Sequence, residues 1–244
     1  MSQFVSELRQ TMVPGRNTKQ GPLPPLLVLM TLVTGLVDAF SYLVLGHVFV
    51  ANMTGNVVLL GFALVGAPGF SIAASLAAIA AFGVGALVGG KVGSRFARNR
   101  GQLFSTAAAI QAVFLVSGVV LAALSTNPLT AGVRYSVIVV LTIAMGIQNA
   151  GARKLAVPDL TTTVLTMTIT GVAADSHVAG GQGSKAARRL IAIAAMLLGA
   201  VIGATLVLHA LIAYPLAIAL VVTVFAAAAS WMLARSSADW VREQ

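Results

Sequence analysis

The sequence contains Asn52-Met53-Thr54-Gly55-Asn56 near the start of one apolar segment, residues 48–65, and Asp159-Leu160-Thr161-Thr162-Thr163 near the start of another, residues 157–174. Each segment is 18 residues long, slightly shorter than the roughly 20 apolar residues that cross a bilayer as a helix. Whether these two segments cross the membrane or return to the side from which they entered decides the topology of the chain.

The rest of the chain consists mostly of longer apolar runs. Of 244 residues, 58% are hydrophobic, and only 15 Lys and Arg and 6 Asp and Glu are charged, which excludes an ordinary soluble domain. Six runs have the length of full transmembrane helices: residues 26–45, 71–90, 103–124, 133–152, 190–209 and 216–234. The polar segment before them, residues 1–25, lacks the pattern of a signal peptide. The composition predicts an all-α polytopic membrane protein.

The distribution of Lys and Arg favours six crossings, because short cytoplasmic loops carry an excess of these residues. With a cytoplasmic N-terminus and two re-entrant segments, 14 of the 15 Lys and Arg residues face the cytoplasm, and only Arg134 lies outside. If both segments cross instead, the split falls to 9 against 6. We therefore predict six transmembrane helices, two re-entrant broken-helix segments, and both termini in the cytoplasm.

Three sequence matches predict an internal repeat. They occur in the same order at offsets of 111, 107 and 114: residues 35–39 with 146–150, 53–58 with 160–165, and 85–90 with 199–204. Each half has three crossings, an odd number, so the second half would be inverted in the membrane. The predicted organisation is an N-terminal segment at 1–25, repeats at 26–125 and 126–234, and a tail at 235–244.

Asp38 is the only carboxylate well inside a predicted transmembrane helix, where an ionised acid costs about 2.5–3.5 kcal/mol. Gly35, Asp38, Ala39 and Tyr42 share one helical face, and the matching face in the second half carries Gly146, Asn149, Ala150 and Arg153. One interpretation makes Asp38 a proton or cation coupling site, with Asn149 its neutral counterpart. The alternative is a buried acid that hydrogen-bonds to Thr, Asn or the amide end of a broken helix and only fixes packing.

The two polar clusters offer hydroxyl, amide and freed backbone groups but no strong nucleophile or base, which suits binding of a small solute. Half-helices that begin after the clusters would turn their free N–H groups towards the middle and favour an anion. Alternatively, the Asn and Thr residues only cap these helices. The predicted substrate-binding residues are Asp38, Tyr42, Asn52, Thr54, Asn56, Gln148, Asn149, Asp159, Thr161, Thr162, Thr163 and Thr166.

Pairs of glycines four residues apart let helices approach closely. The pairs Gly85 with Gly89 and Gly199 with Gly203 are expected either between the two halves or in a homo-oligomer. The chain has no cysteine, its histidines lack metal-ligand spacing, and no hydrolase motif is present, so we expect no metal, no cofactor and no enzymatic activity. The expected partners are a small-molecule solute and the lipid bilayer, not nucleic acid.

Residues 35–39, the string from Phe49 to Asn56, residues 146–150, and the later Val157-Pro158-Asp159-Leu160-Thr161-Thr162-Thr163 resemble signatures of the YoaK family, over residues 26–234. The resemblance implies a bacterial inner-membrane protein of unknown function, regarded as a small-molecule transporter without an established substrate. It supplies no functional residues.

The sequence thus predicts a secondary transporter of a small metabolite, with an anion as the favoured class, that works by alternating access around a site in the middle of the membrane. Coupling to H⁺ or another cation through Asp38 is a further hypothesis. The alternatives are a passive channel built from the same two segments, and a membrane scaffold or sensor that transports nothing.

Overall fold

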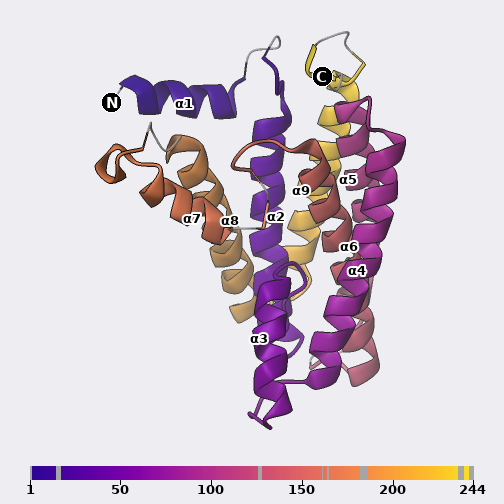
Figure 1. Cartoon of the computed structure of the whole chain (residues 1–244). Coiled ribbons are helices and arrows are strands. Elements are labelled where there is room, and N and C mark those ends of the chain that lie inside the picture. The colour runs from indigo at the N-terminus through magenta and orange to yellow at the C-terminus, as the bar shows by residue number, and fades with distance from the viewer. Residues whose placement is uncertain are drawn as a thin grey trace.

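The computed structural model describes residues 2–14, 18–125, 128–160, 162–163, 165–181, 186–235 and 239–241 (Figure 1). This part of the chain is helical and contains no strand. The α-helices are α1 (Ser2–Met12), α2 (Leu23–Val44), α3 (Met53–Leu64), α4 (Ile72–Arg95), α5 (Arg100–Ala123), α6 (Ala131–Leu155), α7 (Leu165–Ala174), α8 (Ala186–Leu208) and α9 (Tyr214–Leu233). Two short 3₁₀ helices, η1 (His177–Ala179) and η2 (Asp239–Val241), complete the described elements.

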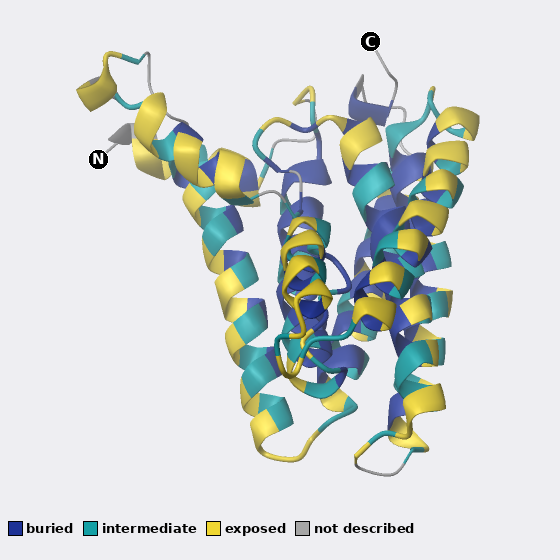
Figure 2. Cartoon of the chain, turned by 60° about the horizontal axis from the view of Figure 1, so that its bottom comes forward, coloured by how far each residue is buried: buried dark blue, intermediate teal, exposed yellow. Residues whose placement is uncertain are grey.

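Six of the described helices are long and apolar enough to cross a membrane: α2, α4, α5, α6, α8 and α9. The prediction of an all-α protein with six such helices is therefore confirmed. The two segments of uncertain status each contain one short apolar helix, with 12 residues in α3 and 10 in α7. The bundle buries its centre and exposes its outer faces (Figure 2). Those outer faces are apolar, as Leu87, Leu197 and Val221 illustrate with exposed fractions of 70%, 63% and 67%, which suits a surface covered by lipid.

The long helices pack in pairs that join the first half of the chain to the second. The most extensive contacts are those of α4 with α6 and of α2 with α8, followed by α5 with α6, α5 with α9, and α2 with α9. The short helices lie on the outside of two of these pairs, α3 against α4 and α7 against α8. Each short helix therefore rests on the long helix that follows it in the chain.

Glycine makes the two tightest helix pairs possible. A Cβ atom on Gly35 would lie 2.2 Å from the carbonyl oxygen of Met196, and one on Gly199 would lie 2.1 Å from that of Leu32. In the α4–α6 pair, Cβ atoms on Gly85 and Gly146 would lie 2.2 Å and 2.4 Å from the carbonyl oxygens of Ile143 and Phe82. The helix backbones are thus in direct contact at both crossings.

Gly89 and Gly203 continue these crossings one turn further along, since their Cβ positions would lie 2.8 Å from Ile147 O and 2.9 Å from Leu36 O. The four glycines that the sequence analysis singled out therefore pack between helices of a single chain. These glycine surfaces already contact helices of the same chain, so they are not free to contact a second copy. A homo-oligomer remains a prediction.

Basic residues gather at one end of the bundle, where α2 begins and α9 ends and which holds both termini (Figure 1). We call this the basic end and the opposite one the far end. Arg100 ties the basic end together by donating to the carbonyl oxygens of Lys19 at 3.1 Å and Leu155 at 2.8 Å. Among described residues, Arg134 alone of the Lys and Arg lies at the far end; the basic end holds Arg9, Lys19, Lys91, Arg95, Arg98, Arg100, Arg153, Lys154, Arg188, Arg189 and Arg235.

The helix crossings lead to a first prediction. Gly85→Ala should lower the free energy of unfolding by roughly 1–3 kcal/mol, because the new methyl group forces α4 away from α6. Gly83→Ala, on the same helix with no atom within 4 Å of its Cβ position, is the matched control and should unfold at the wild-type temperature or slightly above it. Thermal unfolding in detergent, followed by size-exclusion chromatography, measures both. Equal unfolding temperatures for the two variants would contradict this packing.

Candidate functional site

Asp38 holds the non-helical backbone that leads into α3. Its Oδ1 accepts hydrogen bonds from the backbone N–H groups of Val50 at 3.1 Å and Ala51 at 2.8 Å, and the side chain is buried. This is the arrangement set out above as the alternative to coupling: an acid in one helix that binds the amide end of a broken helix. A coupling role for Asp38 must therefore act through this link.

The asparagines of the first polar cluster also bind backbone. Asn52 caps α3 by accepting a hydrogen bond from Gly55 N at 3.2 Å. Asn56 is fully buried; its Oδ1 accepts from Phe49 N at 2.9 Å, and its Nδ2 donates to Phe49 O at 2.6 Å. Together these side chains fix the sharp reversal between α2 and α3.

The second cluster has a comparable arrangement with different residues. Thr163 donates a hydrogen bond to Asn149 Oδ1, and Asn149 Nδ2 donates to Met145 O one turn back on α6 at 2.9 Å. Thr162 is buried in a left-handed backbone conformation, and its hydroxyl has no hydrogen-bond partner in the described part of the chain. Thr161 lies outside the described residues. Asn149 thus positions the approach to α7, as Asp38 positions the approach to α3.

In each short segment, the residues before the short helix are linked to the residues after it. His47, before α3, lies 3.0 Å through Nδ1 from the carbonyl oxygen of Gly69, which follows α3. Arg189 on α8 makes ion pairs of 2.8 Å with both Asp159, before α7, and Asp175, directly after it. Gly171 leaves room for this guanidinium, because its Cβ would lie 2.5 Å from the Arg189 Cζ atom.

A cavity of about 1200 Å³ lies where the N-terminal ends of α3 and α7 approach α6. Five of the predicted binding residues line it, from both clusters, from α6 and from α7: Asn52, Thr54, Asn149, Thr163 and Thr166. The structure thus brings the two polar clusters to one space. The other described candidates do not line the cavity: Asp38, Tyr42, Asn56, Gln148, Asp159 and Thr162.

Two of these outlying candidates have other contacts. Tyr42 stacks on Phe49 at a ring distance of 4.9 Å and contacts His47 edge to face at 5.1 Å. Gln148 donates to Met30 O at 3.2 Å and Thr34 Oγ1 at 3.0 Å, and it accepts from Gln111 at 2.7 Å. Gln148 therefore joins three helices.

The cavity also has a cationic wall that the sequence analysis did not assign to a site. Arg153 and Lys154 of α6 line it, and none of its described lining residues is a carboxylate. Both side chains are exposed, so the cavity reaches the surface at the basic end. In the sequence, Arg153 shares a helical face with Gly146, Asn149 and Ala150, and this face indicates that Arg153 belongs with the polar residues around the cavity.

In the described part of the chain, no group of three or more His, Asp or Glu side chains is placed to hold a metal ion. The described polar side chains that line the cavity are amides, hydroxyls and two cations, all of which can bind a solute.

The six long apolar helices in the described part of the chain define a polytopic α-helical membrane protein. Residues 26–229 match the family described as "Protein of unknown function (DUF1275)", and the chain belongs to that family. It is also 37% identical over 151 residues to the "UPF0700 transmembrane protein YoaK" of Bacillus subtilis (strain 168); the match covers 62% of this chain and 65% of that protein's length. No solved structure matches the chain. The predicted family resemblance is confirmed.

The contacts of Asp38 lead to a second prediction. Asp38→Ala leaves the Val50 and Ala51 amides without a partner, which costs roughly 1–3 kcal/mol for each amide, so the unfolding temperature in detergent should fall clearly. Asp38→Asn keeps an oxygen acceptor at the same place and should retain most of the wild-type stability. If both variants were as stable as the wild type, these hydrogen bonds would not anchor α3.

Proposed function

We propose that the protein is a secondary transporter of a small anionic metabolite, and that the cavity between the ends of α3 and α7 is its binding site. One observation carries the proposal: the two polar clusters, more than 100 residues apart in the sequence, meet in one cavity with Arg153 and Lys154, and no carboxylate is among its described lining residues. A scaffold without transport would have no need of such a space.

The helix pairings support an inverted repeat in which α2, α3, α4 and α5 correspond to α6, α7, α8 and α9. Exchanging each helix for its counterpart turns the α2–α8 pair into the α6–α4 pair and leaves α5–α9 unchanged. The glycine contacts follow the same rule, since Gly35 meets Gly199 and Gly146 meets Gly85. Transporters built this way place their sites near the bilayer midplane, between discontinuous helices.

Two observations support re-entrant segments. The contact of His47 with Gly69 lies across the base of the first segment, and the pairs of Arg189 with Asp159 and Asp175 lie across the base of the second. In our proposal the first segment enters from the far end and the second from the basic end. Their polar tips then meet in the interior, where irregular backbone is tolerated only if it is enclosed by protein or lines water.

The positive-inside rule orients this proposal in the cell. The crowding of Lys and Arg at the basic end favours a cytoplasmic location for that end and for both termini. The membrane would then be a bacterial inner membrane. In this orientation the cavity opens to the cytoplasm through Arg153 and Lys154.

Coupling to H⁺ or a cation would act through Asp38, although Asp38 does not line the cavity. Its carboxylate binds the amides of Val50 and Ala51, directly before Asn52, which caps α3 and lines the cavity. A change in the charge of Asp38 would change the strength of its hydrogen bonds to Val50 and Ala51. Binding of the ion and binding of the solute would then be linked through the N-terminal end of α3.

A flux assay tests the substrate class. In proteoliposomes, a panel of labelled mono- and dicarboxylates and inorganic phosphate should contain at least one solute that the wild type takes up. Arg153→Gln and Lys154→Gln should each reduce that uptake roughly tenfold at low solute concentration, the size expected when a charge-assisted hydrogen bond is lost. Arg98→Gln, at the same end and outside the cavity, should leave uptake unchanged. An equal loss in all three variants would argue for surface charge.

Alternating access can be tested separately because the chain has no cysteine. Thr54→Cys should react with a membrane-impermeant thiol reagent from the basic-end side, and a transported solute should slow the reaction by excluding the reagent. Val65→Cys, 84% exposed after α3, is the control for the opposite side. Rapid reaction of Thr54→Cys from both sides at once would instead indicate the passive channel.

A further inference from the structure

Helix α1 lies across the basic end of the bundle rather than along it, next to the start of α8 and α2 (Figure 1). The long helices are those that cross the membrane, so a helix placed across their ends lies at the depth of the lipid headgroups. This position distinguishes α1 from every other α-helix that the structure describes.

One side of α1, next to the buried Thr11, carries an apolar stripe. Phe4, Val5, Leu8 and Met12 share one side of the helix and are 43%, 54%, 38% and 46% exposed. No described part of the protein covers the stripe. The outer faces of the bundle are also apolar, so the bilayer that surrounds the bundle can also cover this stripe.

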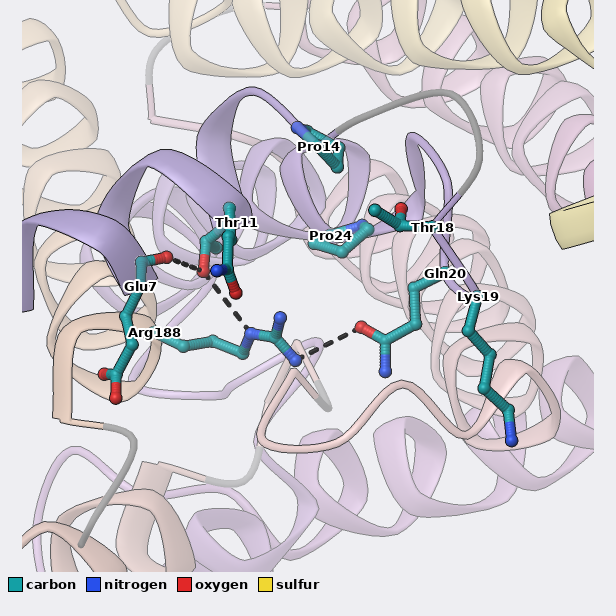
Figure 3. Close-up of a pocket in the computed structure, with 9 residues that line it drawn as sticks. Glu7, Thr11, Pro14, Thr18, Lys19, Gln20, Pro24 and Arg188 are labelled. Carbon is teal, nitrogen blue, oxygen red and sulfur yellow. Dashed lines mark hydrogen bonds between the residues drawn. The ribbon is translucent and has the colours of Figure 1, made fainter. Parts of the chain in front are cut away.

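The inner surface of α1 covers a cavity of about 430 Å³ between α1, the approach to α2, and the start of α8 (Figure 3). Arg188 extends into this space, with Nε 3.4 Å from Thr11 Oγ1 and Nη1 3.2 Å from Gln20 Oε1. Both partners are neutral, so these hydrogen bonds orient the guanidinium without neutralising it.

The charges around this cavity favour an anion. Lys19 and Arg188 line it, and Glu7 is the one carboxylate among its described lining residues. Arg188 forms no ion pair with Glu7 in the described part of the chain, where the ion pairs are those of Arg189. A guanidinium whose geometry is fixed and whose charge has no counter-ion among the described residues matches a phosphate group.

We propose that α1 is an interfacial helix that lies in the membrane surface through Phe4, Val5, Leu8 and Met12, and that the cavity beneath it binds the phosphate of an anionic phospholipid through Arg188 and Lys19. The two features support each other, because the apolar stripe holds the cavity at the level where lipid phosphates lie. The bound lipid would stabilise the junction of α1 with α2 and α8. This proposal rests on the membrane location of the chain and is independent of what the chain transports.

Lipid titration in detergent tests the phosphate site. Dioleoyl phosphatidylglycerol, added to the full-length protein, should raise its unfolding temperature and bind in native mass spectra in preference to dioleoyl phosphatidylcholine. Arg188→Gln and Lys19→Gln should each weaken that preference roughly fivefold, as expected for one basic side chain at an anionic surface. Arg98→Gln, at the same end but outside this cavity, should leave it unchanged.

Two outcomes would overturn the lipid site. The first is an equal preference for phosphatidylglycerol in the wild type and both cavity variants. The second is an equal rise in unfolding temperature with inorganic phosphate or glycerol phosphate, which would identify a site for soluble anions. Unfolding temperatures without added lipid show whether a variant is simply misfolded, and Arg188→Lys, which keeps the charge, should retain part of the preference.

The position of the apolar stripe can be measured with single cysteines, since the chain has none of its own. In nanodiscs, a polarity-sensitive fluorophore on Leu8→Cys should emit at a shorter wavelength than the free dye in water, and it should resist aqueous quenching by iodide. The same fluorophore on Ser6→Cys, exposed on another side of the helix, should be quenched readily. Equal quenching at the two positions would show that α1 does not lie in the membrane surface.

Discussion

The structure depends on one constraint: inside a bilayer, a backbone N–H or C=O group that leaves a helix must find its partner within the protein. The chain breaks its helical pattern twice, before α3 and before α7. At the first break Asp38 binds the amides of Val50 and Ala51, and Asn56 binds both backbone polar groups of Phe49. At the second, Asn149 holds Thr163. These polar side chains make the breaks possible, and the cavity exists because the breaks do.

This constraint separates two kinds of polar residue that look alike in the sequence. Asn56 faces backbone, whereas Thr54, two residues away, lines the cavity. Both belong to one polar cluster, and spacing alone does not distinguish them, because the direction of each side chain depends on a reversal that is not helical. The sequence therefore located the candidate site to within a few residues, but it could not tell which members bind a ligand and which satisfy the backbone.

The long helices were predictable because length and apolar composition decide them, whatever the neighbours are. The helices that contact Gly35 and Gly85 were not predictable. Such a glycine can pack against the other half of the same chain or against a second copy of the chain, and only the tertiary structure decides between them. The role of Arg153 in the cavity was not predicted, for a different reason. A basic residue at the end of a transmembrane helix is fully explained by the positive-inside rule, so its charge alone does not indicate that it also lines a cavity. The apolar spacing of Phe4, Leu8 and Met12 was readable in principle, but the polar average of residues 1–25 concealed it.

The helix pairs also explain how a charge at Asp38 could influence the whole molecule. Direct backbone contact makes α2 with α8 one stiff unit and α4 with α6 another, and α7 rests on the first while α3 rests on the second. Asp38 belongs to the α2–α8 unit, yet it binds the stretch that leads into α3. Asn149 belongs to the α4–α6 unit, yet it binds Thr163, before α7. Each residue therefore links the two units. In the proposed transporter, rocking of one unit against the other must change both links, and only the link through Asp38 carries an ionisable group.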